Sequence, residues 1–200
     1  MIYPKNLNKN DYIGVIATSK GISKDTEILK FEKAKENFEK YGHQIIESNN
    51  IMKNDKARSS SGKERAEEFL KLWSDKNVKA IITLKGGQFL IEMLPYLNEH
   101  KDILKNSQPK WIQGFSDTTV LSYYLTTNFD IATIHADNFM NYGMKQIGES
   151  QLNTIKILEG AEISAIDPFI IAYCGGTCPI SALYIMGTRK SPKASFNVSS

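Results

Sequence analysis

The feature that most constrains the fold of this chain is a repeated alternation of short apolar runs with longer segments of helical periodicity. The apolar runs cover residues 12–17, 78–84, 111–115 and 131–134. Each of them leads into a short loop of small or polar residues, which is typical of buried strands. Strand, loop, helix and strand in this order indicate an α/β fold, in which a parallel sheet carries helices on both faces.

The segments between these runs have the spacing of amphipathic helices. Residues 25–41 and 118–127 are predicted helices, and residues 44–48 are a further short strand. Another helix is predicted to start after Ser61, because Ser61 can cap it while Glu64 completes a capping box three positions later. The apolar positions of the first helix are Ile28, Phe31, Ala34 and Phe38, and those of the helix after Ser61 are Ala66, Phe69, Leu70 and Trp73.

Candidate site residues follow the strands at one edge of the predicted sheet. In a parallel sheet, the loops after the carboxyl ends of the strands gather on one edge, and ligands bind there. One edge is therefore expected to collect residues from four different loops. They are Thr18 and Ser19, Gly86 and Gly87, Ser116 and Asp117, and His135.

Ser116 is the first candidate for chemistry, because it stands between a predicted strand and a predicted helix. A serine on such a sharp turn exposes its hydroxyl beside helix N–H groups, which can stabilise an oxyanion. The surrounding pattern is not G-x-S-x-G, since Thr118 stands where the second glycine would be. The alternative interpretation is that Ser116 or Asp117 merely caps the following helix.

Gly86 and Gly87 directly follow another predicted strand. Two glycines allow the backbone to approach a ligand closely, either as an oxyanion-binding N–H pair or as a phosphate cradle. The dinucleotide fingerprint G-x-G-x-x-G is not present, and a plain tight turn is the alternative interpretation.

A serine nucleophile needs a base, and histidine is the usual one. The chain has His43, His100 and His135, of which only His135 is predicted on the ligand edge. The alternative is a structural His135, hydrogen-bonded to backbone at a strand end.

Four further residues are expected to carry no chemistry. Cys174 and Cys178 have the spacing C-x₃-C, with no histidine or further cysteine nearby, so no metal site is predicted there. Glu92 and Glu99 flank an apolar segment and are expected to face solvent.

Composition and charge exclude several function classes. The net charge of +3, from 25 basic against 22 acidic residues, is too even for a nucleic-acid-binding surface. Two cysteines and a start without an apolar leader favour a reducing cytoplasm. Residues 168–188 contain no charged residue, and this segment has about the length of a membrane span. Gly175, Gly176 and Pro179 interrupt this segment, so a buried strand, turn and helix is favoured over a membrane span.

Five blocks in register point to one family. They are residues 3–19 (with a gap at 8–10), 61–69, 86–97, 111–119 and 135–138, and they extend over roughly residues 1–158. Together they resemble the LD-carboxypeptidases, serine peptidase family S66, of the muramoyltetrapeptide carboxypeptidase and microcin-immunity type. Residues 114–117, Gly-Phe-Ser-Asp, resemble the nucleophile segment G-[YF]-S-D of that family. His135-Ala136-Asp137-Asn138 resembles its strand-end H-G-x-N.

The resemblance implies a serine hydrolase that removes a C-terminal amino acid through an L,D peptide bond. Cytoplasmic members trim D-alanine from muropeptides in cell-wall recycling, and microcin-immunity members cleave peptide–nucleotide antibiotics. By this resemblance Ser116 is the nucleophile, and the N–H groups of Asp117 and of the Gly86–Gly87 turn form the oxyanion hole. Thr18, Ser19 and His135 are placed at the substrate edge. The resemblance implies a peptide or muropeptide substrate, a homodimer in the full-length family, and neither cofactor nor metal.

One departure from the family bears on activity. The family places its catalytic Glu and His in a β-rich C-terminal domain, which is expected to be largely missing here. We expect a flavodoxin- or Rossmann-like nucleophile domain over residues 1–160 and an aberrant or incomplete start of the C-terminal domain over 161–200. Without base and orienting acid, the chain is expected to be inactive or impaired.

Other functions stay open at this point. One is a non-catalytic protein that binds peptide or muropeptide in the same cleft. Another is an active enzyme in which His135 serves as base for Ser116. A nucleotide-binding flavodoxin-like protein is less favoured, because the glycine-rich fingerprint is missing.

Overall fold

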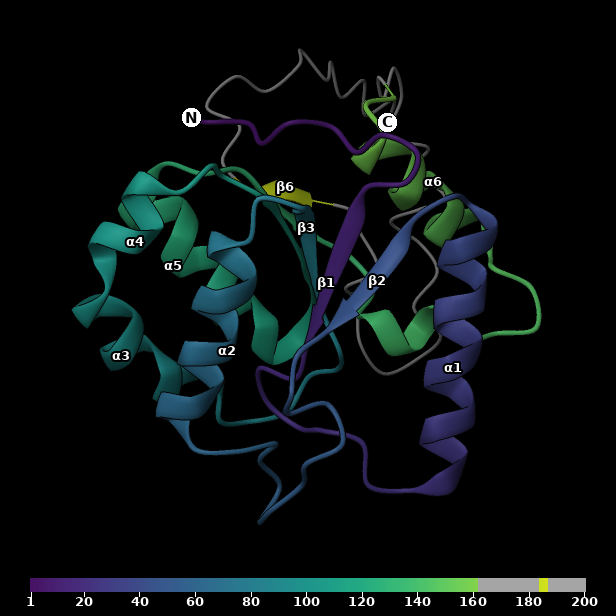
Figure 1. The fold of residues 1–200 in the computed structure, drawn as a ribbon, viewed down its shortest axis with the longest axis horizontal. Coiled ribbons are helices and arrows are strands. Elements are labelled where there is room, and N and C mark those ends of the chain that lie inside the picture. Colours follow the sequence, from purple (N-terminus) through teal and green to yellow (C-terminus); the bar gives the residue numbers. More distant parts are fainter. Residues whose placement is uncertain (162–183, 187–200) are drawn as a thin grey trace, which may run out of the picture.

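A mixed β-sheet forms the centre of the protein (Figure 1), with strands in the order β2-β1-β3-β4-β5-β6. The structure is a computed structural model and describes residues 1–161 and 184–186. The strands are β1 (Tyr12–Ile16), β2 (Gln44–Glu47), β3 (Val78–Thr83), β4 (Trp111–Gly114), β5 (Thr133–His135) and β6 (Tyr184–Met186).

The first five strands are all parallel, which confirms the predicted α/β fold. Their order, 2-1-3-4-5, is that of the flavodoxin-like doubly wound sheet. The direction of winding reverses between β1 and β3, and ligands of such sheets bind at this switch point. The sixth strand differs from the expected wholly parallel sheet, because β6 pairs antiparallel with β5. An antiparallel edge strand on a parallel sheet is common, since it covers an otherwise open edge.

Helices cover both faces of the sheet (Figure 1). One face carries α1, η3 and α6, and the other carries η1 and α2 to α5, which agrees with two separate apolar clusters in the core. The α-helices are α1 (Asp25–Lys40), α2 (Gly62–Ser74), α3 (Leu94–Glu99), α4 (Lys101–Asn106), α5 (Thr119–Phe129) and α6 (Glu149–Leu158). The 3₁₀ helices are η1 (Leu90–Met93), η2 (Ser116–Thr118) and η3 (Phe139–Tyr142).

The core explains why the strands are continuous apolar runs. In β3, Ala80 and Ile82 belong to the cluster under α1, whereas Val78 and Ile81 belong to the cluster under α2. Successive side chains of a strand point to opposite faces, so a strand covered on both sides carries apolar residues on both of its faces.

Some local expectations are corrected by the structure. Ile28 is 38% exposed and does not lie on the buried face of α1. The helix predicted over 118–127 begins with a separate 3₁₀ turn and extends to Phe129. Half of the predicted capping box forms: the Ser61 hydroxyl accepts the N–H of Glu64 at 3.2 Å, but the Glu64 carboxylate pairs with Lys53.

The predictions for the end of the chain lie almost wholly outside the described residues. They concern the uncharged segment 168–188, Cys174 and Cys178, and the domain division at 160, and all of them stay predictions. Among the helices of the described ranges, none combines the length and the hydropathy needed to cross a bilayer.

Candidate active site

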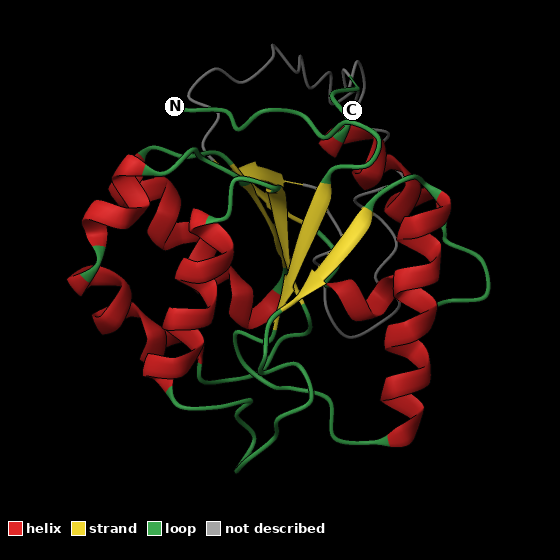
Figure 2. Ribbon diagram, viewed as in Figure 1, coloured by secondary structure: helices red, strands yellow, loops and turns green. Residues whose placement is uncertain are grey.

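The loops after β1, β3, β4 and β5 meet at the carboxyl edge of the sheet, the lower edge in Figure 2. The loop after β1 carries Thr18 and Ser19, and the loop after β3 carries the Gly86–Gly87 turn. Since β1 and β3 flank the point where the winding reverses, these two loops border the place where a ligand is expected.

Ser116 lies on a strained turn directly after β4. Its φ angle is 64°, in the left-handed region that costs a non-glycine residue about 1–3 kcal/mol. Phe115 before it is extended, and η2 starts at Ser116 itself. A sharp, strained strand-to-helix turn presents the serine hydroxyl at the carboxyl edge of the sheet, as in a nucleophile elbow.

Gly86 packs directly against Ser116. A Cβ atom at Gly86 would lie 3.0 Å from the Ser116 Cβ and 3.1 Å from its Oγ. A side chain at this position would therefore press on Ser116, which would have to give by a few tenths of an ångström. Because glycine has no side chain, the Gly86 backbone can approach the Ser116 hydroxyl closely.

The Asp117 carboxylate holds neighbouring loops and does not cap a helix. Its Oδ2 accepts the hydroxyl of Ser19 and the backbone N–H of Leu90, the latter at 2.9 Å. Neither η2 nor α5 has a side-chain cap. The interpretation that Ser116 or Asp117 merely caps the helix is therefore wrong, because Asp117 is used for contacts between loops.

Asn138 supports the turn from the loop after β5. Its Oδ1 accepts the Thr83 hydroxyl at 2.7 Å and the N–H of Phe115 at 3.2 Å. A Cβ at Gly114 would lie 2.7 Å from the same Oδ1, so the chain needs glycine there. The sequence indicated Asn138 only as part of a family motif, and its role beneath the turn follows from the fold.

Thr18 and Ser19 are both buried at this edge. Ser19 donates its hydroxyl to Asp117, and a Cβ at Gly87 would lie 2.7 Å from the Ser19 Cβ. The Thr18 carbonyl accepts a hydrogen bond from Arg65 at 2.7 Å. Thr18 is thus bonded to helix α2 and Ser19 to the turn after β4. Their predicted place at the substrate edge stays a prediction.

His135 is 8% exposed at the end of β5. Its Nδ1 lies 3.3 Å from the Thr119 Oγ1, and its Nε2 is buried without a partner among the described residues. The structural alternative expected a hydrogen bond from the ring to backbone. Among the described residues the ring makes no such bond. Burial lowers the pKa of the imidazole, which keeps it neutral at neutral pH.

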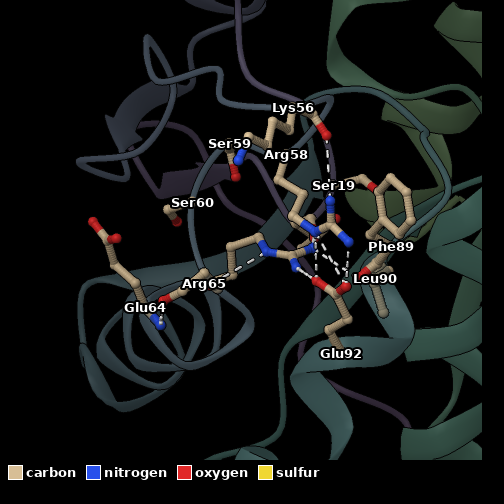
Figure 3. Close-up of polar contacts among 12 residues, drawn as sticks. Ser19, Lys56, Arg58, Ser59, Ser60, Glu64, Arg65, Phe89, Leu90 and Glu92 are labelled. Carbon is tan, nitrogen blue, oxygen red and sulfur yellow. Dashed lines mark hydrogen bonds and ion pairs between the residues drawn. The ribbon is translucent and has the colours of Figure 1, made fainter.

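A second polar cluster, missed by the sequence analysis, lies beside these loops (Figure 3). The Glu92 carboxylate accepts hydrogen bonds from Arg58 Nη2 at 2.6 Å and from Arg65 Nη2 at 2.7 Å. The hydrogen bond from Arg58 lowers the pKa of the Glu92 carboxyl below its ordinary value. The expectation that Glu92 faces solvent holds only in part: its side chain is 36% exposed, but its carboxylate is paired with two arginines. One signal for Arg65 was available, since it precedes Phe69 by four positions and so shares the buried face of α2.

Fold and site together define a class. A doubly wound sheet that presents a serine on a strained turn against a glycine of the next loop is the arrangement of α/β hydrolytic enzymes. A sequence model of the LD-carboxypeptidase N-terminal domain, peptidase family S66, matches residues 13–136. The chain belongs to this family, as its sequence blocks indicated.

Curated relatives agree with this assignment. A Vibrio cholerae protein named as a carboxypeptidase is 37% identical over 123 residues, which are 60% of this chain and 35% of the relative. The microcin C7 self-immunity protein MccF of Escherichia coli is 34% identical over 92 residues, which are 46% of this chain and 26% of that protein.

Solved structures show the same fold. MccF in complex with aspartyl sulfamoyl adenosine matches with a TM-score of 0.73 and 25% identity, over 81% of this chain and 48% of that chain. An MccF-like protein from Bacillus anthracis matches with a TM-score of 0.72 and 27% identity, over 79% of this chain and 47% of that chain. In each of these four comparisons the chain thus spans less than half the length of the protein that it matches.

Proposed function

We propose that residues 1–160 form the nucleophile domain of a serine-type LD-carboxypeptidase, with Ser116 as nucleophile. The observation that carries this proposal is the left-handed Ser116 turn, at a φ of 64°, packed against Gly86. Strain at a serine, next to a glycine that leaves room for a reacting group, is what an exposed nucleophile requires.

In this mechanism the Ser116 Oγ bonds to the carbonyl carbon of an L,D peptide bond while its proton passes to a base. The negative charge that develops on the carbonyl oxygen is stabilised by the N–H of Asp117 and by N–H groups of the Gly86–Gly87 turn. When the intermediate collapses, the C–N bond breaks, and the released amine takes up the proton. Water then hydrolyses the acyl-serine ester and restores the hydroxyl.

The base for this step is proposed to come from outside residues 1–161. Within that part of the chain, Asp117 is bonded to Ser19 and Leu90, and His135 is bonded to Thr119, so neither is paired with the Ser116 hydroxyl. Oxyanion hole and binding alone retain about 10³–10⁴-fold catalysis over water in a triad protease. Because the resemblance places the catalytic Glu and His of the family in its C-terminal domain, we propose that the 200-residue chain by itself is inactive or strongly impaired.

The proposed substrate is a muropeptide that ends in D-alanine, cleaved in the cytoplasm during cell-wall recycling. The family assignment supports a peptide-like substrate with a free C-terminus. A peptide–nucleotide substrate is a second candidate, because this chain is similar to MccF, which has been solved with aspartyl sulfamoyl adenosine. The proposal includes the homodimer of the full-length family.

Labelling with a fluorophosphonate probe tests the role of Ser116 without a natural substrate. The probe phosphonylates activated serines, so imidazole is added in this and every later labelling experiment, in place of the base proposed to lie outside residues 1–161. Peptide mass spectrometry identifies the modified residue. We expect a single adduct on Ser116 in the wild type and none in Ser116→Ala. Labelling of another serine, or equal labelling of both proteins, would contradict the assignment.

Release of D-alanine from an L,D-linked tetrapeptide tests the need for an external base. We expect little release from the chain alone and an increase when imidazole is added, because free imidazole can accept the Ser116 proton. Ser116→Ala with the same imidazole gives the background. Rapid release without imidazole would mean that the chain itself contains a base, with His135 as the first residue to replace. Tight peptide binding that is unchanged in Ser116→Ala, without turnover, would favour a non-catalytic binding protein.

A further inference from the structure

We infer that Arg65, a buried guanidinium on α2, is a positioning residue that together with Asp117 sets the glycine turn against Ser116. This inference rests on the proposed function, since it concerns the geometry in which Ser116 reacts. Arg65 lies outside the family motif around Ser116, on a helix about fifty positions earlier in the chain.

Arg65 is fully buried, and its hydrogen bonds reach two different loops of the site edge. Nη1 donates to the carbonyl of Thr18 at 2.7 Å and to the carbonyl of Phe89 at 2.9 Å. Nη2 donates to the Glu92 carboxylate at 2.7 Å. One rigid guanidinium therefore joins the loop after β1 to the loop after β3, from the helix that packs beside both (Figure 3).

Asp117 holds the same two loops at the adjacent residues. Its carboxylate accepts the Ser19 hydroxyl, next to Thr18, and the N–H of Leu90, next to Phe89. The positive charge of Arg65 and the negative charge of Asp117 also attract each other. The hydrogen bonds of Arg65 and those of Asp117 form two clamps, each of which joins the loop after β1 to the end of the segment from Gly86 to Leu90. Together they determine the position of the glycine turn relative to Ser116.

Glu92 and Arg58 complete the arrangement on its exposed side. Arg58 binds Glu92 with two nitrogens, Nε at 2.9 Å and Nη2 at 2.6 Å. Its guanidinium also lies over the Phe89 ring, 3.6 Å from the ring centre. The carbonyl of Phe89 is thus held by Arg65 while its ring is covered by Arg58. The loop that carries the glycine turn is restrained from both sides.

Stability alone does not explain why Arg65 is charged and buried. Removing a guanidinium from water costs several kcal/mol, and apolar replacements of buried ion pairs are often neutral or stabilising. The other buried positions of α2 are in fact apolar: Ala66, Phe69, Leu70, Leu72 and Trp73. A buried charge among them is explained by what it orients, because an oxyanion hole loses much of its effect when its donors shift by about 0.5–1 Å.

Arg65→Lys tests the inference in the full chain. Lysine keeps the charge, but its single nitrogen cannot hold both carbonyls and Glu92 in one geometry. We expect the maximal rate of fluorophosphonate labelling at Ser116 to fall about tenfold or more, with the half-saturating probe concentration unchanged. The matched control is Lys63→Gln, which removes an exposed ion-pair partner of Glu67 on the same helix. Its labelling rate should stay within about twofold of the wild type.

Hydrogen exchange of single amides shows where the variant acts. In Arg65→Lys we expect faster exchange at Leu90, whose N–H is bonded to Asp117, and unchanged exchange in β1 and β3. Faster exchange at Leu90 with a normal labelling rate would make Arg65 a structural residue only, which overturns the inference. Normal labelling and normal exchange in a folded Arg65→Lys protein overturn it as well.

Glu92→Gln decides the question if Arg65→Lys does not fold. Glutamine keeps the shape of Glu92 but loses the charge that pairs with both arginines, so we expect a smaller fall, about threefold, in the maximal labelling rate. An unchanged rate would overturn the inference. If the wild-type protein itself is not labelled at Ser116, the proposed function fails. If the wild type is labelled and the variants are labelled equally fast, only the inference about Arg65 fails.

Discussion

The two edges of the sheet use left-handed backbone in different ways. At the amino edge, Asn10 and Asp130 have φ angles of 70° and 57°. At the carboxyl edge, Ser116 has a φ angle of 64°. Asparagine and aspartate tolerate this region better than other non-glycine residues, whereas serine has no such advantage. The amino edge thus places suitable residues in its turns. The carboxyl edge accepts strain at Ser116, and the loop after β2 does so at Lys56 and Ala57, with φ angles of 45° and 67°.

The glycines of the two edges differ in the same sense. Gly42 at the amino edge has a φ angle of 84°, and an added Cβ would meet the flexible side chain of Lys9 at 2.8 Å. Gly86 at the carboxyl edge has no unusual φ, but an added Cβ would press on Ser116. Gly42 allows the backbone conformation of a turn, and Gly86 leaves room beside the Ser116 hydroxyl. Substitutions should therefore separate stability from reactivity.

Gly86→Ala should have the largest effect of the changes that distinguish the two edges. We expect Ser116 labelling by a fluorophosphonate to fall about a hundredfold, because a methyl group would stand against the hydroxyl and displace the donors of the oxyanion hole. Gly42→Ala is the control: it should lower the free energy of unfolding by about 1 kcal/mol and leave labelling unchanged. Equal labelling of Gly86→Ala and wild type would remove the distinction between the two glycines.

Lys110 should give an effect on stability alone. It is buried before β4 at the amino edge, where its Nζ donates to the carbonyls of Asp75 and Val78 at 2.6 Å each. Burial lowers the pKa of the Lys110 ammonium to about 8, below its ordinary value of 10.5. Between these two pH values the unfolded chain binds more protons than the folded one, so the free energy of unfolding rises with pH.

The comparison with Lys110→Met isolates this term. Urea unfolding from pH 7.5 to pH 10.5 should show a rise in wild-type stability relative to the variant, with most of it above about pH 8. Parallel pH profiles of the two proteins would show that Lys110 keeps its ordinary pKa. Ser116 labelling of the variant should match the wild type, since Lys110 lies at the opposite edge from the candidate site.

His135 should give the smallest effect, at the carboxyl edge. Because burial lowers the pKa of its imidazole, the unfolded chain takes up the proton first as the pH falls below about 6.5. Stability should therefore decrease from about pH 6.5 down to the folded pKa and then level off. NMR titration of the ring gives the folded pKa directly, and His135→Asn removes the term from the unfolding profile. A folded pKa above 6.5 would contradict the expected direction.

Strands and their shared edge can be predicted with good accuracy because their cause is local. The run from Val78 to Leu84 is apolar at nearly every position, since both faces of β3 are covered, and its end at the Gly86–Gly87 turn is visible as a change of composition. Parallel connections then place all carboxyl ends together. The sequence alone is therefore enough to bring Ser116, Gly86 and Ser19 to one edge.

The charged residues around the site cannot be predicted in the same way. Glu92 is expected to face solvent, because a charged residue near a helix is usually exposed. The spacing of Arg65 from Phe69 indicates the buried face of α2, but no local signal tells which groups Arg65 binds there. Their pairing joins positions that are 27 residues apart. Likewise, Asp117 is a plausible helix cap unless its partners, Ser19 and Leu90, are known.

The features of this protein thus fall into two groups, those that follow from local sequence and those that depend on long-range contacts. The alternation of apolar runs and helical segments was sufficient for the α/β class, and short motifs were sufficient for the family, because both depend on neighbours in the sequence. The left-handed turn of Ser116, the clamps formed by Arg65 and Asp117, and the antiparallel pairing of β6 depend on which distant segments come together. Only packing decides this, since a hydrogen bond across a loop is made when the whole sheet is in place.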